Sequence, residues 1–186
     1  MTVKIVYATR YGSSREISGW IAERLESEGF TVRLENAADA EGAEGYDLVL
    51  LGSGIYNHGF LKELEDYMEA HSDSLKGTKT ALFGVAMKTE PIMHKGKSHG
   101  GIIMLEKYAQ QLGDSVIGCE MLHGQMVFSA MNEKDRKGIE QFYKMIGMTE
   151  TEAAERKKPR TLMSKVECWE FACGLIEKLN RTKVKA

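Results

Sequence analysis

Five short apolar runs, each typical of a buried strand, alternate along the chain with longer segments whose apolar residues recur every three or four positions. This alternation predicts a parallel sheet with helices on both faces, because each helix must carry the chain back to the start of the next strand. The expected fold class is therefore α/β. The predicted strands are 2–7, 30–34, 46–51, 80–85 and 115–121. The predicted helices are about 15–28, 60–71, 101–112, 134–146 and 164–179, with a charged connection through 155–159 before the last one.

Composition limits the domain count and the partners. A chain of 186 residues with 42% hydrophobic side chains can bury one sizeable core, so we expect residues 1–186 to form a single domain. The net charge of −2 excludes the strongly basic surface that sequence-independent nucleic-acid binding requires. The chain begins directly in strand-like sequence without a leader pattern, and no apolar run is long enough to span a membrane. We therefore expect a cytoplasmic protein without stable membrane insertion.

The three cysteines give no indication of a disulfide framework. Cys119, Cys168 and Cys173 are odd in number, lack C-x-x-C spacing and stand in apolar-patterned stretches. We expect reduced residues of the core. A redox pair of Cys168 and Cys173 is the alternative, but residues five apart do not share a helical face.

Ligands of such parallel sheets bind outside the carboxyl ends of the strands, where the strand order reverses. Three loops should meet there: 8–14, 53–59 and 86–100. These loops are the predicted location of the functional site.

The first loop has the composition of an anion site. Thr9, Ser13 and Ser14 offer hydroxyls, Gly12 permits a tight turn, and the positive end of the following helix faces the same place, an arrangement that suits a phosphate dianion. The alternative is an ordinary helix cap made by Ser13 or Ser14. No G-x-x-x-x-G-K-[ST] motif is present, and the glycines at 52 and 54 lack the third glycine of a dinucleotide-binding loop.

Residues 8–17, Ala-Thr-Arg-Tyr-Gly-Ser-Ser-Arg-Glu-Ile, resemble the phosphate loop of flavodoxins, in the variant T-R-x-G-x-[ST]-x-x-I. That variant is typical of flavodoxin-like proteins that include menaquinone-linked protoporphyrinogen oxidase, and the similarity extends to residues 52–56. The resemblance implies a flavodoxin-like, five-stranded parallel sheet and bound FMN. The FMN-binding residues that it implies are Thr9, Arg10, Tyr11, Gly12, Ser13, Ser14, Ser53, Gly54, Ile55, Tyr56, Asn57, Ala86, Met87 and Lys88.

The resemblance also assigns parts to the other two loops. Tyr56 is the residue expected to stack on the flavin, unless it is a half-buried tyrosine at a loop edge. The 86–100 loop offers no aromatic residue, so Met87 or Met93 would pack on the other face of the ring. The basic residues of this loop would act on the flavin, dock a partner or simply face water. Its two histidines lack the further ligating residues that a metal site needs. These basic residues are Lys88, His94, Lys95, Lys97 and His99.

Two functions agree with these features. The first is an FMN-dependent low-potential electron carrier between redox proteins, with an iron–sulfur protein or a flavoenzyme as partner, and it requires no catalytic residue. The second is a flavin-dependent dehydrogenase or oxidase of the menaquinone-linked protoporphyrinogen oxidase type. The stretch after the fifth strand, 122–137, is less apolar than such an enzyme would need for a membrane or a quinone, which favours the carrier. Methionines 126, 131, 145 and 148, taken as exposed, would permit a homodimer.

Overall fold

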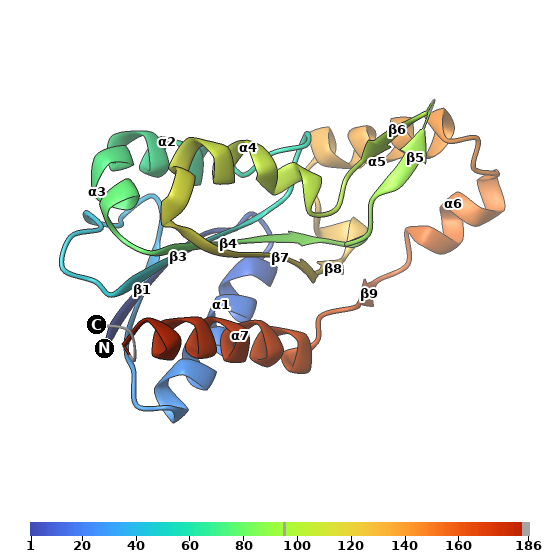
Figure 1. Ribbon diagram of the computed structural model, residues 1–186. Helices are drawn as coiled ribbons and strands as arrows, with labels where there is room; N and C mark the ends of the chain where they lie inside the picture. Colours follow the sequence, from blue (N-terminus) through green and yellow to red (C-terminus); the bar gives the residue numbers. More distant parts are fainter. Residues whose placement is uncertain (95, 184–186) are drawn as a thin grey trace.

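The structure is a computed structural model that describes residues 1–94 and 96–183. Its centre is a five-stranded sheet in the order β2-β1-β3-β4-β7, in which every neighbouring pair is parallel (Figure 1). The predicted parallel sheet is thus confirmed, and its strand order is that of the flavodoxin-like fold. The strands are β1 (Thr2–Ala8), β2 (Thr31–Asn36), β3 (Leu48–Gly54), β4 (Thr80–Ala86) and β7 (Val116–His123).

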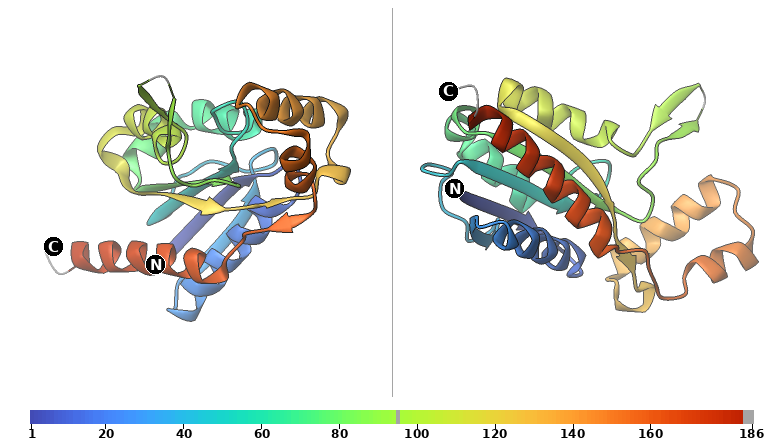
Figure 2. Two further views of the ribbon diagram at one scale, coloured as in Figure 1. Left: turned by 90° about the vertical axis from the view of Figure 1, so that its right-hand side faces the viewer. Right: turned by 60° about the horizontal axis from the view of Figure 1, so that its bottom comes forward.

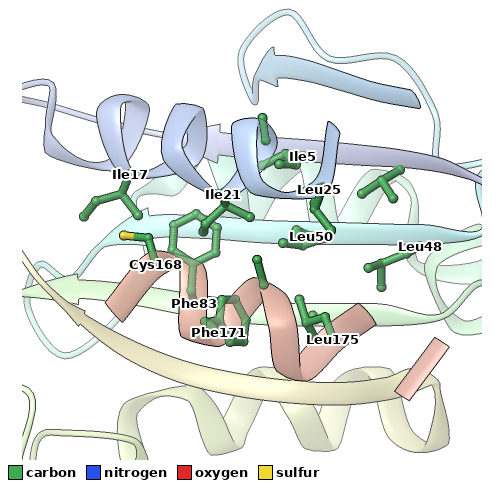
Figure 3. Packing of buried hydrophobic residues seen from close by; sticks show 14 of the residues in the cluster. Ile5, Ile17, Ile21, Leu25, Leu48, Leu50, Phe83, Cys168, Phe171 and Leu175 are labelled. Carbon is green, nitrogen blue, oxygen red and sulfur yellow. The ribbon is translucent and has the colours of Figure 1, made fainter. Parts of the chain in front are cut away.

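Helices cover both faces of this sheet, as the sequence predicts. On one face α1 (Ser13–Ser27) and α7 (Lys165–Lys183) lie side by side, and the other face carries α2 (Lys62–Ala70), α3 (Ser72–Gly77) and α4 (Ile103–Leu112). Figure 3 shows the first layer, where side chains of α1 and α7 meet those of the strands. The helical period predicts this burial, since Ile17, Ile21 and Leu25 are fully buried. The short helix α3 was not predicted.

The strand order reverses beside β1. From β1 the chain moves outward to β2, and then returns to the opposite side of β1 to form β3, with Ala8 opposite Ser53. The loops that follow β1 and β3 therefore leave the sheet next to each other. This is the point at which α/β sheets bind their ligands.

A long segment extends beyond the carboxyl ends of the strands, between β7 and α7 (Figure 2). We call residues 124–163 the α5–α6 arm. Its ends are joined by the antiparallel pair β8 (Gln125–Met126) and β9 (Arg160–Thr161), and between them lie α5 (Glu133–Met145) and α6 (Glu150–Arg156). Helix α5 confirms the helix predicted at 134–146. The charged connection predicted through 155–159 is wrong at its start, because residues 155 and 156 still belong to α6.

The long loop after β4 contains a second unpredicted element. Residues 92–99 form an antiparallel hairpin of β5 (Ile92–His94) and β6 (Lys97–His99), which stands away from the sheet (Figure 2). Among the cysteines, only Cys168 is fully buried, whereas Cys119 and Cys173 are partly exposed, and all three are free. No helix within the described ranges has the length and apolar character that crossing a bilayer would need.

Candidate functional site

The loop between β1 and α1, residues 8–14, leaves the positive end of α1 open. Gly12 is the N-cap residue, with a φ of 95° that favours glycine, and no side chain of the described residues caps the helix. The alternative in which Ser13 or Ser14 caps α1 is therefore wrong. Thr9 Oγ1 accepts a hydrogen bond from the Gly12 N–H at 2.9 Å, which fixes the turn. The backbone N–H groups of the first helical turn remain available to an anion.

The loop after β3 makes a tight turn without glycine at its centre. Tyr56 and Gly59 exchange two backbone hydrogen bonds, of 2.8 and 3.0 Å, across Asn57 and His58. Both central residues have positive φ, 48° for Asn57 and 64° for His58, as in a type I′ turn. The Ile55 N–H donates to the Val85 carbonyl at 3.0 Å, which fixes this turn against the end of β4.

These loops surround a cavity of about 980 Å³ at the carboxyl ends of β1, β3 and β4. All the residues that the sequence predicts for the site line this cavity, except Gly12 and Ser53. Ser53 is fully buried instead, where its Oγ accepts from the Leu61 N–H at 3.0 Å and donates to the Gly54 carbonyl at 2.8 Å. We assign Ser53 to the support of the loop.

Tyr56 lies in the wall of the cavity beside a cation. The Arg10 guanidinium carbon is 4.3 Å from the centre of the Tyr56 ring, so one face of the ring is already in a cation–π contact. Burial raises the pKa of Tyr56 to about 12, although the charge of Arg10 acts in the opposite direction. The phenol is thus neutral at physiological pH. A flat ligand that stacks on Tyr56 must use the other face or displace Arg10.

The 86–100 loop reaches the cavity with its first residues. Of the described residues in this loop, Ala86, Met87 and Lys88 line the cavity. Met93 lies in the hairpin with 71% of its surface exposed and does not line the cavity, so Met87 is the methionine of this pair that does. Lys95 and the side chains of His94 and Lys97 lie outside the described residues. Of the two predicted basic side chains that the structure describes in this loop, Lys88 lines the cavity and His99 does not.

The α5–α6 arm contributes a wall that the sequence did not predict. Met131, Ile139 and Phe142 face the cavity, together with the more polar Lys134 and Gln141. The prediction of exposed methionines is wrong for three positions, because Met126 is buried and Met131 and Met148 are half-buried. Met126 and Met131 line the cavity. The available signal was the helical spacing of Ile139 and Phe142 within α5.

Comparison with known proteins agrees with this architecture. The flavodoxin domain model matches residues 4–153, so the chain belongs to the flavodoxin-domain family. Among curated proteins it is similar to protoporphyrinogen IX dehydrogenase [quinone] of Escherichia coli (strain K12), 26% identical over 87 residues. That match covers 46% of this chain and 48% of the relative, so the chain spans about half the length of the curated relatives it matches.

Solved flavodoxins share the fold. The structure is similar to a flavodoxin from the domain Archaea, with a TM-score of 0.54, 16% identity and coverage of 97% of this chain and 99% of that one. It is also similar to oxidised flavodoxin 2 from Bacillus cereus, with a TM-score of 0.53, 18% identity and coverage of 96% and 99%. FMN is the cofactor that the family implies, and the uncapped helix end beside hydroxyl groups suits its phosphate.

Proposed function

We propose that this protein is an FMN-dependent, low-potential electron carrier between redox proteins, with an iron–sulfur protein or a flavoenzyme as its partner. The observation that carries this proposal is the uncapped N-terminus of α1 beside Thr9, Ser13 and Ser14, at the reversal of strand order. A phosphate there would accept hydrogen bonds from hydroxyls and from backbone N–H groups, and it would meet the positive end of the helix.

The residues around the cavity fit the rest of the cofactor. Bound FMN would supply the capacity to accept and release electrons, and the chain would supply binding, orientation and electrostatics. Tyr56 would pack on the ring with a neutral phenol, and Met87 would offer a polarizable side chain beside it. Lys88 would place a positive charge at the cavity wall. None of these roles requires a nucleophile or a general base.

A carrier should exchange electrons with a protein partner at a rate that depends on salt. We expect the reduced protein to transfer electrons to a small iron–sulfur protein, at a rate that falls as salt screens the docking charges beyond a Debye length of about 10 Å at 0.1 M. Stopped-flow absorbance at a series of salt concentrations measures this rate. A rate that does not respond to salt, or no transfer to any iron–sulfur protein or flavoenzyme, would contradict the carrier.

A second candidate is a flavin-dependent dehydrogenase or oxidase of the protoporphyrinogen oxidase type. The α5–α6 arm favours it, because Met131, Ile139 and Phe142 give the cavity an apolar wall that a protein partner does not need. The volume of about 980 Å³ is also near the upper end of small-molecule sites, about 300–1,000 Å³. Saturable oxidation of protoporphyrinogen with a quinone acceptor would decide for this enzyme and against the carrier.

A further inference from the structure

Asp135, in the first turn of α5, contacts the loop between β1 and α1. Its two carboxylate oxygens lie 2.7 and 2.8 Å from Arg10 Nη1. The Tyr11 hydroxyl donates a third hydrogen bond to Asp135 Oδ2, at 2.6 Å. Arg10 and Tyr11 are the two residues that precede Gly12, the N-cap residue of α1. Helix α5 is therefore joined to the same short loop that offers the proposed phosphate site.

Asn132 makes this junction more rigid. Its backbone N–H donates to the Tyr11 hydroxyl oxygen at 3.0 Å, so Tyr11 is held from both sides. Its side chain caps α5, because Oδ1 accepts from the Asp135 N–H at 2.8 Å and Nδ2 donates to Asp135 Oδ2 at 3.2 Å. We call Arg10, Tyr11, Asn132 and Asp135 the clasp.

The clasp is charged at neutral pH. Burial by itself would raise the pKa of the Asp135 carboxyl, but the hydrogen bonds from Tyr11 and Arg10, together with the charge of Arg10, outweigh it and lower that pKa. The Asp135 side chain is 13% exposed and that of Arg10 is 36% exposed, so water reaches the pair mainly from the side of Arg10. Hydrogen bonds to a charged group of this kind are stronger than neutral ones.

Burial contributes little to the position of α5, and its other ion pair to a different segment of the described chain, Glu140 with Lys157 at 2.6 Å, lies within the arm itself. Of the thirteen described residues in this helix, Tyr143 alone is buried. Nevertheless, Ile139 and Phe142 of α5 form part of the cavity wall, so the position of the helix decides how open the cavity is. An element with few buried contacts detaches readily unless specific interactions at its ends hold it. At the N-terminal end of α5, the clasp is that interaction.

We propose that Asp135 is a positioning residue, which holds α5 over the FMN site through Arg10 and Tyr11 and so slows the release of FMN. The proposal rests on the proposed function for its ligand. The geometry of the clasp does not depend on the ligand, so the hold on α5 can be tested separately.

The test compares Asp135→Asn and Tyr11→Phe with the wild-type protein and with Glu150→Gln. The Glu150→Gln control removes the same charge from α6, in the same arm but outside the clasp and the cavity. The first readout is FMN dissociation, followed by flavin fluorescence after dilution into an excess of a flavin-binding trap. The second is the rate of trypsin cleavage after Lys134, Arg136 and Lys137 in the FMN-free protein.

Each clasp variant should release FMN about tenfold faster or more, because charge-assisted hydrogen bonds are lost, and trypsin should cut α5 correspondingly faster. Glu150→Gln should stay within about twofold of the wild type in both readouts. Unchanged or slower FMN release in Asp135→Asn and Tyr11→Phe overturns the proposal, and slower release would mean that Asp135 repels the phosphate. If the wild type binds no FMN, the proposed function fails. Equal rates of trypsin cleavage in the wild type and all variants would then also contradict the claim that Asp135 keeps α5 in place.

Discussion

Gly52→Ala should lower the free energy of unfolding by about 3 kcal/mol, because the new methyl group overlaps a buried ring. A Cβ at position 52 would lie 1.8 Å from Phe83 Cζ. Phe83, in β4, is fully buried, and its ring packs edge to face against that of Phe171 in α7 (Figure 3). Gly52 lies in β3, opposite Tyr7 of β1 and Phe83 of β4, so neither the strand nor the ring can move without disturbing the sheet. Urea unfolding followed by circular dichroism measures the effect.

A second glycine provides the matched control. Gly19 lies inside α1, and a Cβ there would meet no atom within 4 Å apart from the adjacent backbone of its own helix. Gly19→Ala should therefore stabilise the protein by between about 0.5 and 1 kcal/mol, as alanine does within helices. Opposite signs for the two substitutions are the expected result. A Gly52→Ala protein within about 1 kcal/mol of the wild type would show that Phe83 does not require the space above Gly52.

The double substitution Thr9→Ala with Ser14→Ala should weaken FMN binding by about 1 to 3 kcal/mol, because two hydroxyl donors to a charged phosphate are lost. The fold should be retained, since neither side chain belongs to the two core clusters. Loss of Thr9 Oγ1 also removes the acceptor of the Gly12 N–H, which loosens the turn. Equilibrium titration of the flavin-free protein with FMN measures the change.

Two comparisons make this titration specific for the phosphate. Riboflavin lacks the phosphate, so its affinity should be nearly equal for the double variant and the wild type. Ser27→Ala removes a hydroxyl at the opposite end of α1, where it donates to the Arg24 carbonyl, and it should leave FMN affinity unchanged. FMN affinity that does not differ between the double variant and the wild type would place the phosphate elsewhere.

The centre of the sheet was predictable because its strands β1, β3 and β4 are buried on both faces. Runs 46–51 and 80–85 are nearly continuous in apolar residues, a pattern typical of strands that are buried on both faces, as β3 and β4 are. The predicted ends of the strands were less accurate. Strand β3 begins two residues later and ends three residues later than predicted. Its last residues, Gly52, Ser53 and Gly54, are small and lack the branched or aromatic side chains typical of strands.

The arm was only partly predictable. Helix α5 has a strong helical period, whereas α6 is short and no residue of it is buried, so no apolar pattern marks it. Its clearest signal was the capping box of Thr149 and Glu152, which the structure forms in both directions. The pairing of β8 with β9 joins residues more than thirty positions apart, and two-residue strands carry no readable pattern.

The site shows the same division between local and distant contacts. The phosphate loop could be predicted because its function depends on residues adjacent in sequence at a helix start. The contact of Arg10 and Tyr11 with Asp135 could not be predicted. These residues are 125 and 124 positions apart, and no pattern in a single sequence relates them. The inward position of Ser53 was hidden for a related reason, since a serine in a loop motif has the same letter whether it faces a ligand or the backbone of Leu61.

The central claim, that the cavity at the carboxyl ends of β1, β3 and β4 binds FMN, is tested most directly by identifying the flavin in the purified protein. The protein is saturated with a mixture of FMN, FAD and riboflavin, freed of excess flavin by gel filtration and denatured, and the released flavin is identified by chromatography and its absorption spectrum. We expect FMN in an amount equal to that of the protein. Release of FAD or riboflavin in place of FMN, or of no flavin, would contradict the assignment.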